Sequence, residues 1–334
     1  MTHPFAQPAL ADLLAAARVV AIPTRTRFRG VTVREAVVFD APAGASEFSP
    51  FPEYDDAEAS AWLAAAIEFG WGRPEADAPI LRERIPVNAT VPAVPAAEVA
   101  GVLARFPGCR TAKVKVAERG QTLADDLARV AAVREEMGPE ALVRVDANGG
   151  WSLPEAEAAL RALAPFGLDY AEQPCASVPE LVELRGRLAS LVRIAADESV
   201  RKADDPLAVA RAGAADLLVV KAQPLGGIAN ALRIVDRAGL PVVVSSALDT
   251  SVGIAMGLHL AAALPAGVLA GACGLGTVAL LDGDVTRQPL VPIDGELPVT
   301  RPALDAELLD RFAAPPERAA WWRERITRCF DRLG

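Results

Sequence analysis

Residues 142–148 read LVRVDAN, a β-branched apolar run that ends in polar residues. The same form recurs around it: 111–116 is TAKVKV, 168–174 is LDYAEQP, 192–199 is VRIAADES and 215–223 is ADLLVVKAQ. Stretches rich in Ala and Leu, with helical character, separate these runs. Strands that alternate with helices predict a parallel sheet with right-handed crossover connections.

One chemical group stands at the end of each run. The step along the chain is 26 residues from Asp146 to Glu172, 25 from there to Asp197 and 24 on to Lys221, and Lys115 ends the preceding run. In a (β/α)8 barrel the C-terminal ends of the strands form the active-site face. The regular order therefore predicts a barrel whose rim carries these five side chains.

Eight candidate strands can be counted from residue 85 onwards, which favours closure of the sheet. They are 85–91, 111–116, 142–147, 168–173, 192–198, 215–222, 240–247 and 268–273. A doubly wound open sheet is the alternative, but such a sheet gathers its ligands at one switch point. Here the chemical groups lie on five successive strands, as expected for a closed ring.

The two ends of the chain do not follow the strand–helix alternation. Residues 21–28 and 31–40 resemble a hairpin, and 57–71 resembles an amphipathic helix capped by Asp55 or Asp56. We therefore predict an α+β capping domain over residues 1–85, which residues 285–334 return to complete, and a barrel over residues 86–284.

Composition limits the classes of function. The chain has 334 residues, 52% of them hydrophobic, and a net charge of −9, which argues for a packed globule and against a nucleic-acid partner. We see no signal peptide, no bilayer-spanning stretch and no sign of a protein partner. The four scattered cysteines predict reduced thiols and a cytoplasmic protein.

The three carboxylates Asp146, Glu172 and Asp197 are predicted to bind a metal ion. Adjacent strands would crowd them together, and crowded carboxylates repel unless a cation neutralises them. Oxygen ligands favour Mg²⁺ or Mn²⁺ over zinc or copper. The structural alternative is that each carboxylate caps a helix or forms a salt bridge in a loop.

The lysines are predicted to face the barrel interior. Lys113 and Lys115 are two residues apart on one strand and so share a face, whereas Lys221 lies half a turn of the barrel away. Lys115 and Lys221 would then flank a small-molecule carboxylate on the metal, and neighbouring positive charges are expected to lower the pKa of these lysines. The alternative is that they extend to solvent at the strand ends.

Further polar groups at the strand ends are candidates for substrate binding. Arg144 and Asn148 share the inward face of the strand that carries Asp146, and Ser245 and Ser246 end the seventh strand. The backbone N–H of Gly274 lies at the end of the eighth strand, and Lys113 is a further inward cation. Arg144 and the serines are as readily explained by an ion pair and an ordinary turn.

As an ordered set these motifs resemble the enolase superfamily, and within it the muconate-lactonizing subgroup with two catalytic lysines. The matching segments are KVK (113–115), DAN (146–148), EQP (172–174), DES (197–199) and Lys221 followed by PLGG (224–227). The resemblance covers nearly the whole chain. It implies that Lys115 removes the proton α to a carboxylate, that Mg²⁺ on the three acids stabilises an enediolate intermediate, and that Lys221 stabilises it from the opposite face.

Other segments resemble one branch of this subgroup, namely 28–39, 50–54, 245–253 and 274–285. That resemblance implies syn dehydration of a succinyl-hydroxycyclohexadiene carboxylate, a step of menaquinone biosynthesis. Racemisation of N-succinylamino acids, dipeptide epimerisation and muconate cycloisomerisation by the same site are the alternatives. Asp282 and Asp284 superficially resemble the DxD of dipeptide epimerases, but we expect them beyond the eighth strand. A barrel that binds a metal or an anion without catalysis is the hypothesis from another class.

Overall fold

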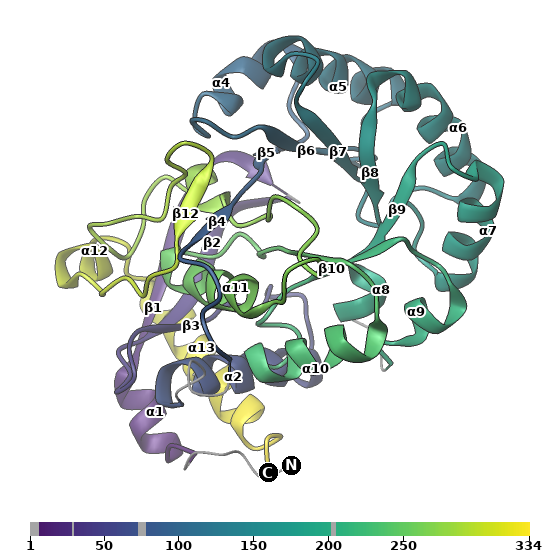
Figure 1. The fold of residues 1–334 in the computed structure, drawn as a ribbon. Helices are drawn as coiled ribbons and strands as arrows, with labels where there is room; N and C mark the ends of the chain where they lie inside the picture. Colours follow the sequence, from purple (N-terminus) through teal and green to yellow (C-terminus); the bar gives the residue numbers. More distant parts are fainter. Residues whose placement is uncertain (1–6, 29, 73–77, 202–204) are drawn as a thin grey trace.

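The computed structural model describes residues 7–28, 30–72, 78–201 and 205–334. Figure 1 shows a curled sheet with helices on its outer side, and beside it a second body built from both ends of the chain. In this described part, no helix combines the length and the apolar character needed to cross a bilayer.

Within the described residues the central sheet has seven parallel strands, in the order β11-β10-β9-β8-β7-β6-β5. Their bounds are Ala89–Val91 (β5), Thr111–Lys115 (β6), Leu142–Asp146 (β7), Leu168–Glu172 (β8), Arg193–Ala196 (β9), Leu217–Val220 (β10) and Val242–Val244 (β11). Strands that follow one another in the chain are neighbours in the sheet, as short right-handed connections require.

The ring closes through residues 269–274, which form single bridges rather than a ladder. These bridges are Val242–Leu269 and Ser245–Gly274 on one side and Val87–Cys273 on the other. The predicted eighth strand at 268–273 is thus in the right place, but it is not a regular strand. Gly271 has φ of 100°, outside the β region, and this interrupts the extended backbone.

The register of the sheet aligns the charged residues. Lys115 lies opposite Asp146, and Asp146 lies opposite Glu172. Because side chains two residues apart on a strand point the same way, each strand turns every second residue inwards. A cluster of buried apolar residues fills the interior beneath the charged level: Tyr170, Ala195, Leu217, Val219 and Val243.

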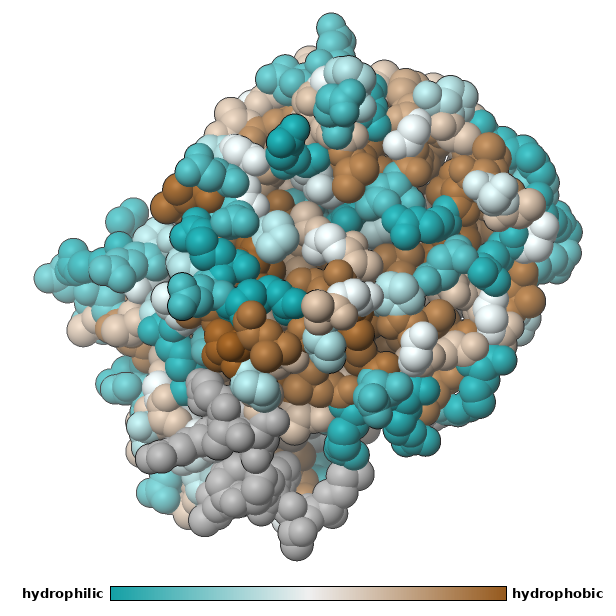
Figure 2. Space-filling view, in the orientation of Figure 1, coloured by the Kyte–Doolittle hydropathy of each residue, from teal (hydrophilic) through white to brown (hydrophobic). Residues whose placement is uncertain are grey.

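Helices cover the outside of the sheet. They are Val99–Leu103 (α4), Leu123–Met137 (α5), Leu153–Leu163 (α6), Val178–Leu188 (α7), Glu198–Arg201 (α8), Ala208–Ala212 (α9), Ile228–Ala238 (α10) and Ser251–Ala263 (α11), with the 3₁₀ turns Ala96–Glu98, Ala164–Phe166 and Thr277–Leu280. Three of them, α5, α6 and α7, begin with a capping box, in which an acid accepts a hydrogen bond from the N–H of a Ser or Thr three residues earlier. Hydrophilic residues cover the edge of the molecule where α6 and α7 lie (Figure 2).

The capping domain combines an antiparallel sheet with helices from both ends of the chain. Its elements are Leu10–Ala16 (α1), Ala17–Phe28 (β1), Val31–Phe39 (β2), Ser46–Phe48 (β3), Asp56–Trp71 (α2), Ala306–Arg311 (α12) and Pro316–Phe330 (α13), and Arg84–Pro86 (β4) pairs with Glu296–Pro298 (β12). Asp55 caps α2, as predicted. Arg318 and Trp322 of α13 donate hydrogen bonds to Glu35 of β2, so the tail does complete this domain. The exact limits at residues 85 and 285 stay predictions.

Two carboxylates of the capping domain bind the N-termini of barrel helices. Glu47 of β3 accepts hydrogen bonds from the N–H groups of Thr250 and Gly253 at the start of α11, each at 3.1 Å. Glu68 of α2 accepts from two N–H groups in the first turn of α10, at 2.6 and 3.1 Å. Negative charge at a helix N-terminus is favourable, so these contacts join the two domains.

Glycine is required where Glu68 meets α10. A Cβ on Gly227 would lie 1.9 Å from a Glu68 carboxylate oxygen, and the residue has φ of 113°. The backbone conformation makes any other residue strained at this position, and a Cβ there would push the Glu68 carboxylate away from the helix.

We expect Glu47→Ala to lower the free energy of unfolding by about 2–4 kcal/mol, because it removes a helix cap and leaves buried N–H groups without an acceptor. Chemical denaturation would measure the change. The exposed Glu53, on the loop that follows β3, provides the control, and Glu53→Ala should shift stability by less than about 0.5 kcal/mol. Equal losses in the two variants would contradict the role of the interdomain cap.

Candidate active site

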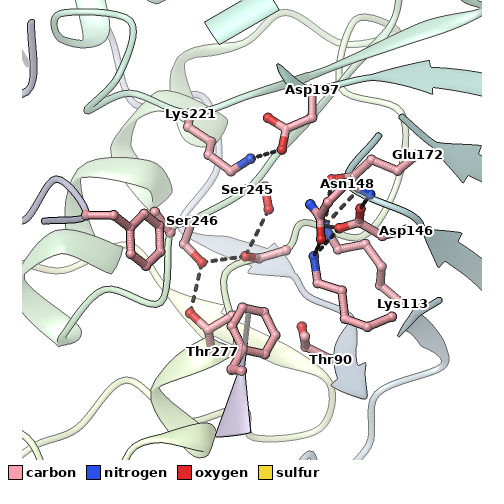
Figure 3. A pocket seen from close by; sticks show the side chains of 15 residues that line it. Thr90, Lys113, Asp146, Asn148, Glu172, Asp197, Lys221, Ser245, Ser246 and Thr277 are labelled. Carbon is pink, nitrogen blue, oxygen red and sulfur yellow. Dashed lines mark hydrogen bonds and ion pairs between the residues drawn. The ribbon is translucent and has the colours of Figure 1, made fainter. Parts of the chain in front are cut away.

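A pocket lies at the C-terminal ends of the barrel strands (Figure 3), and two aromatic side chains of the capping domain help to line it. Its walls combine charged groups on one part of the rim with hydroxyl groups on the other. The lining residues are Phe28, Phe51, Thr90, Lys113, Lys115, Asp146, Asn148, Glu172, Asp197, Lys221, Ser245, Ser246, Ala247, Gly274 and Thr277.

All five residues of the predicted rim line this pocket. Lys115 and Lys113 come from β6, whereas Lys221 directly follows β10 and lies on the opposite side of the pocket from Lys113 in Figure 3. Their placement confirms that the lysines face inwards rather than extending to solvent. Each is buried, with 6–7% of its surface exposed.

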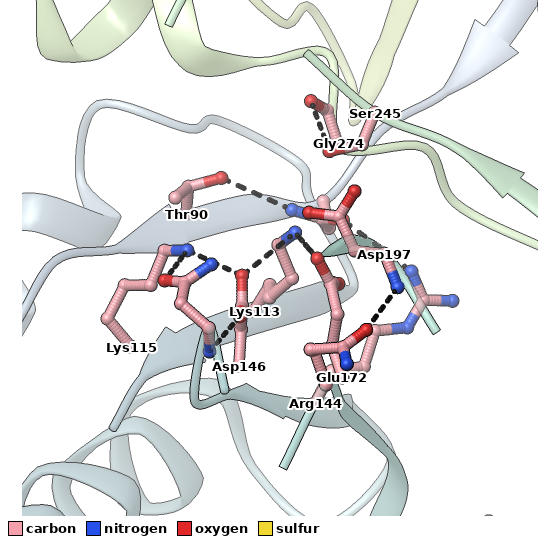
Figure 4. Close-up of polar contacts among 12 residues, drawn as sticks. Thr90, Lys113, Lys115, Arg144, Asp146, Glu172, Asp197, Ser245 and Gly274 are labelled. Carbon is pink, nitrogen blue, oxygen red and sulfur yellow. Dashed lines mark hydrogen bonds and ion pairs between the residues drawn. The ribbon is translucent and has the colours of Figure 1, made fainter. Parts of the chain in front are cut away.

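Each carboxylate of the pocket is paired with a lysine: Figure 4 shows the lysine partners of Asp146 and Glu172, and Figure 3 shows Lys221 beside Asp197. The Nζ of Lys113 donates to both oxygens of Glu172, at 3.0 and 2.9 Å. The Nζ of Lys115 lies 2.5 Å from Asp146 Oδ2. On the other side of the pocket, the Nζ of Lys221 lies 2.5 Å from Asp197 Oδ2.

These pairings set the carboxylate pKa values apart. Burial raises the pKa of Glu172 to about 7, with the negative charge of Asp146 acting in the same direction. Burial acts on Asp146 and Asp197 as well, but the lysines beside them outweigh it and hold the pKa of each below its ordinary value. One of the three acids is therefore poised to exchange a proton near neutral pH.

The lysines also differ from one another. Burial lowers the pKa of Lys221, and Arg201 acts in the same direction against the attraction of Asp197. Burial acts likewise on Lys113, but Glu172 and Asp146 outweigh it and raise the pKa of Lys113. The lowered pKa expected of Lys221 is thus confirmed, whereas the pKa of Lys113 is raised and that residue stays an ammonium group.

The donor set of the pocket suits a hard cation. Three buried carboxylates from adjacent strand ends face one pocket, and oxygen is the ligand that Mg²⁺ prefers. Among the described residues, no three His, Cys, Asp or Glu side chains converge on one point, since each acid is held by a lysine. A metal ion here would take over the neutralisation that the ammonium groups now provide.

Five of the predicted substrate-binding residues line the pocket: Lys113, Asn148, Ser245, Ser246 and Gly274. Asn148 accepts a hydrogen bond from Lys115, at 2.7 Å. The Ser246 hydroxyl donates to the carbonyl of Gly274 and lies 2.9 Å from the hydroxyl of Thr277. The hydroxyls of Ser246 and Thr277 lie on the neutral polar side of the pocket, whereas Asn148 lies among the charged groups.

Arg144, predicted as an ion-pair partner of the carboxylates or a substrate contact, is not among the lining residues. Its guanidinium donates to Asp169 at 2.8 Å and to the carbonyl of Ala272 at 2.6 Å, and it stacks on the ring of Tyr170. The side chain is fully buried in the barrel interior, below the pocket. The structure thus gives Arg144 the alternative role of a structural ion pair.

Several lining residues were not predicted from the sequence. Thr90 had a usable signal, because it ends the first strand on the same face as Asn88. Phe28, Phe51 and Thr277 come from the capping domain and from a 3₁₀ turn, and the spacing of the strand ends gives no sign of them. Phe28 places its ring 5.2 Å from the Nζ of Lys115.

The pair Asp282 and Asp284 lies outside the pocket, as expected. Asp282 forms an ion pair with Arg25 at 3.0 Å. Asp284 accepts hydrogen bonds from the N–H and hydroxyl of Ser251 at the start of α11. Both residues follow the turn Thr277–Leu280, beyond the point where the ring closes.

Two family models match the chain. Residues 19–70 match the enolase N-terminal domain-like model, and residues 96–303 match the enolase C-terminal domain-like model. The chain therefore belongs to the enolase superfamily, whose capping domain and barrel correspond to the two bodies described above.

The sequence relatives carry a more particular name. The chain is 56% identical to a protein named o-succinylbenzoate synthase from Mycobacterium tuberculosis H37Rv, over 98% of this chain and 97% of that one. A relative with the same name from Mycolicibacterium smegmatis is also 56% identical, over 96% and 97% of the two chains.

Solved structures support the fold. The 2-chloromuconate cycloisomerase of Rhodococcus opacus 1CP matches with a TM-score of 0.74 and 26% identity, over 90% of this chain and 98% of that one. A muconate lactonizing enzyme from Pseudomonas fluorescens matches with a TM-score of 0.76 and 22% identity, over 89% and 98%. The second likeness concerns the fold alone.

We expect the affinity for Mg²⁺ to rise with pH up to about 7 and then to level off, because Glu172 must lose its proton before it binds a cation. Calorimetric titration in buffers of different ionisation enthalpy, at about pH 6 and about pH 8, would count the protons released. Proton release should be seen at the lower pH and nearly vanish at the higher one. Equal affinities at the two pH values would contradict the raised pKa of Glu172.

Proposed function

We propose that this chain catalyses the reaction of an o-succinylbenzoate synthase, the syn dehydration of 2-succinyl-6-hydroxy-2,4-cyclohexadiene-1-carboxylate to 2-succinylbenzoate. The observation that carries the proposal is the arrangement of buried lysines and carboxylates on two sides of one pocket. The close relatives with this name, which match almost end to end, support the choice of reaction within the superfamily. The product would serve menaquinone biosynthesis.

Lys115 is the proposed base. Its Nζ takes the proton from the carbon α to the substrate carboxylate, and the electron pair of the broken C–H bond moves onto the carboxylate. That electron pair then returns to form the new double bond of the ring as the C–O bond to the hydroxyl breaks, and the same ammonium group gives its proton to the departing hydroxyl, so that water leaves. One group can perform both transfers because in a syn elimination the proton and the hydroxyl lie on the same face.

The remaining charged groups stabilise the developing negative charge. A proton α to a carboxylate is very weakly acidic, so the anion formed by its removal needs neighbouring positive charge. Lys221 provides such a charge from the opposite side of the pocket, and Lys113 stays an ammonium group beside Glu172. Mg²⁺ held by Asp146, Glu172 and Asp197 would add positive charge at the substrate carboxylate.

The rest of the pocket orients the substrate and keeps water out. Phe28 and Phe51 cover the charged side from the capping domain, and both are buried. Excluding water strengthens every electrostatic interaction in the site. The hydroxyls of Ser245, Ser246 and Thr277 and the backbone at Gly274 would hydrogen-bond the polar groups of the substrate.

We place this reaction in the cytoplasm. The four cysteines, which all lie in the described part of the chain, form no disulfide, as is usual in a reducing compartment. The substrate is a small carboxylate, and the buried pocket at the end of the barrel suits it better than a large partner.

We expect the purified protein to remove the ultraviolet absorbance of the cyclohexadiene with Mg²⁺ present and to leave it unchanged with EDTA. Lys115→Ala should reduce the rate by about 10²–10⁴-fold, the range for loss of a general acid–base group. Wild-type protein that binds Mg²⁺ and leaves the diene intact would contradict the proposed dehydration. N-succinylamino acids and dipeptides would then be the next substrates to test.

Lys221→Arg separates dehydration from racemisation. Racemisation requires proton transfer on both faces, so it should be abolished when Lys221 can no longer exchange a proton. Dehydration requires only positive charge on that side and should partly survive. The two activities are measured by diene absorbance and by the change in optical rotation of an N-succinylamino acid, and loss of both to the same extent would argue for Lys221 as a proton donor in dehydration.

A further inference from the structure

One buried arginine outside the lysine–carboxylate pairs joins both sides of the pocket. Arg201 ends α8, and its side chain is 2% exposed. Its three guanidinium nitrogens donate to three different acceptors: Asp197 Oδ1 at 3.0 Å, Glu198 Oε1 at 2.7 Å and Tyr54 Oη at 3.1 Å. A planar guanidinium bound in three directions has a fixed position.

The first direction leads to Lys221. One carboxylate oxygen of Asp197 accepts a hydrogen bond from Arg201, and the other accepts one from Lys221. Because Arg201 holds Oδ1, the plane of the carboxylate is set and Oδ2 is left for the pocket side. Arg201 therefore orients a proposed metal ligand without itself lining the pocket.

The second direction leads to Lys115. The same oxygen of Glu198 that binds Arg201 accepts a hydrogen bond from the Asn148 amide at 3.2 Å. The carbonyl oxygen of Asn148 then accepts from Lys115 at 2.7 Å. The side chain of Arg201 is thus connected to the proposed base through two intermediate residues.

The third direction leads to the capping domain. Tyr54 belongs to the loop that also carries Phe51, and the two rings contact each other edge to face with centroids 5.5 Å apart. Arg325 of α13 donates to the backbone carbonyls of both residues. The aromatic cover of the pocket and the polar chain to the lysines therefore meet at Tyr54.

We propose that Arg201 is the positioning residue of this site, which holds Asp197 and Lys115 in their working orientations and is itself held by Tyr54 of the capping domain. The effect on turnover rests on the proposed function. The effect on metal affinity does not, because it can be measured without substrate.

The first test is Arg201→Lys, which keeps the charge but cannot bind three acceptors in one plane. We expect the dissociation constant of Mg²⁺ to rise and kcat to fall, each by about 10-fold to 100-fold, as for other groups that orient metal ligands. KM should change much less. Arg185, which pairs with Asp216 at the start of β10, gives a matched control, and Arg185→Lys should leave both quantities unchanged.

The second test is a double-mutant cycle with Tyr54→Phe, which removes one oxygen atom. Alone it should weaken Mg²⁺ binding and lower kcat by about threefold to tenfold, a coupling usual for residues in contact. In the Arg201→Lys background it should have almost no further effect, since the contact is already lost. Calorimetry gives the metal affinity and diene absorbance gives kcat, with thermal unfolding as the check of folding.

Additive effects of the two substitutions, or an unchanged Mg²⁺ affinity in Arg201→Lys, would overturn the proposal. If Arg201→Lys does not fold, Tyr54→Phe alone tests the proposal. A Mg²⁺ affinity and a kcat equal to those of the wild type in Tyr54→Phe would then contradict the positioning role of Arg201. Wild-type protein that binds Mg²⁺ without converting the diene would contradict the proposed function. The Mg²⁺ affinities of the variants would still test the role of Arg201.

Discussion

The neutralisation of buried carboxylates at the strand ends is the constraint on which the structure of this site depends. Asp146, Glu172 and Asp197 are almost without contact to solvent, and an unpaired charge in such a position is very unfavourable. The inward lysines offset much of that penalty within the protein. The regular register of the sheet makes this possible, because it brings acid and base from neighbouring strands to one level.

Much of the site could be predicted because the pattern that encodes it is local. A residue at the end of a β-branched run lies on the rim of the barrel wherever the run is found, so Lys115, Asp146 and Lys221 could be placed from their spacing. Arg144 shows the limit of this reasoning. Alternation along a strand predicts which side of the sheet a side chain faces, but not how far below the rim of the barrel it lies. Arg144 faces the interior, but it lies below the pocket.

The parts that could not be predicted depend on contacts between distant segments. Phe28 and Phe51 reach the pocket only because the capping domain packs over the barrel, and Arg201 gains its role only when Tyr54 and Glu198 lie beside it. The pKa of Lys113 belongs to the same class. The pKa of Lys113 is raised because Glu172 lies beside it in space. Glu172 is 59 residues away in the chain, so the sequence around the lysine does not reveal this contact.

The carboxylates of Glu47 and Glu68 limit which capping domains can be combined with this barrel. Each caps the N-terminus of a barrel helix, and Gly227, which has no side chain, leaves room for one of them. A barrel given the capping domain of another superfamily member would keep its lysines and acids. It would fold well only if the new partner carried acidic residues at both of these junctions.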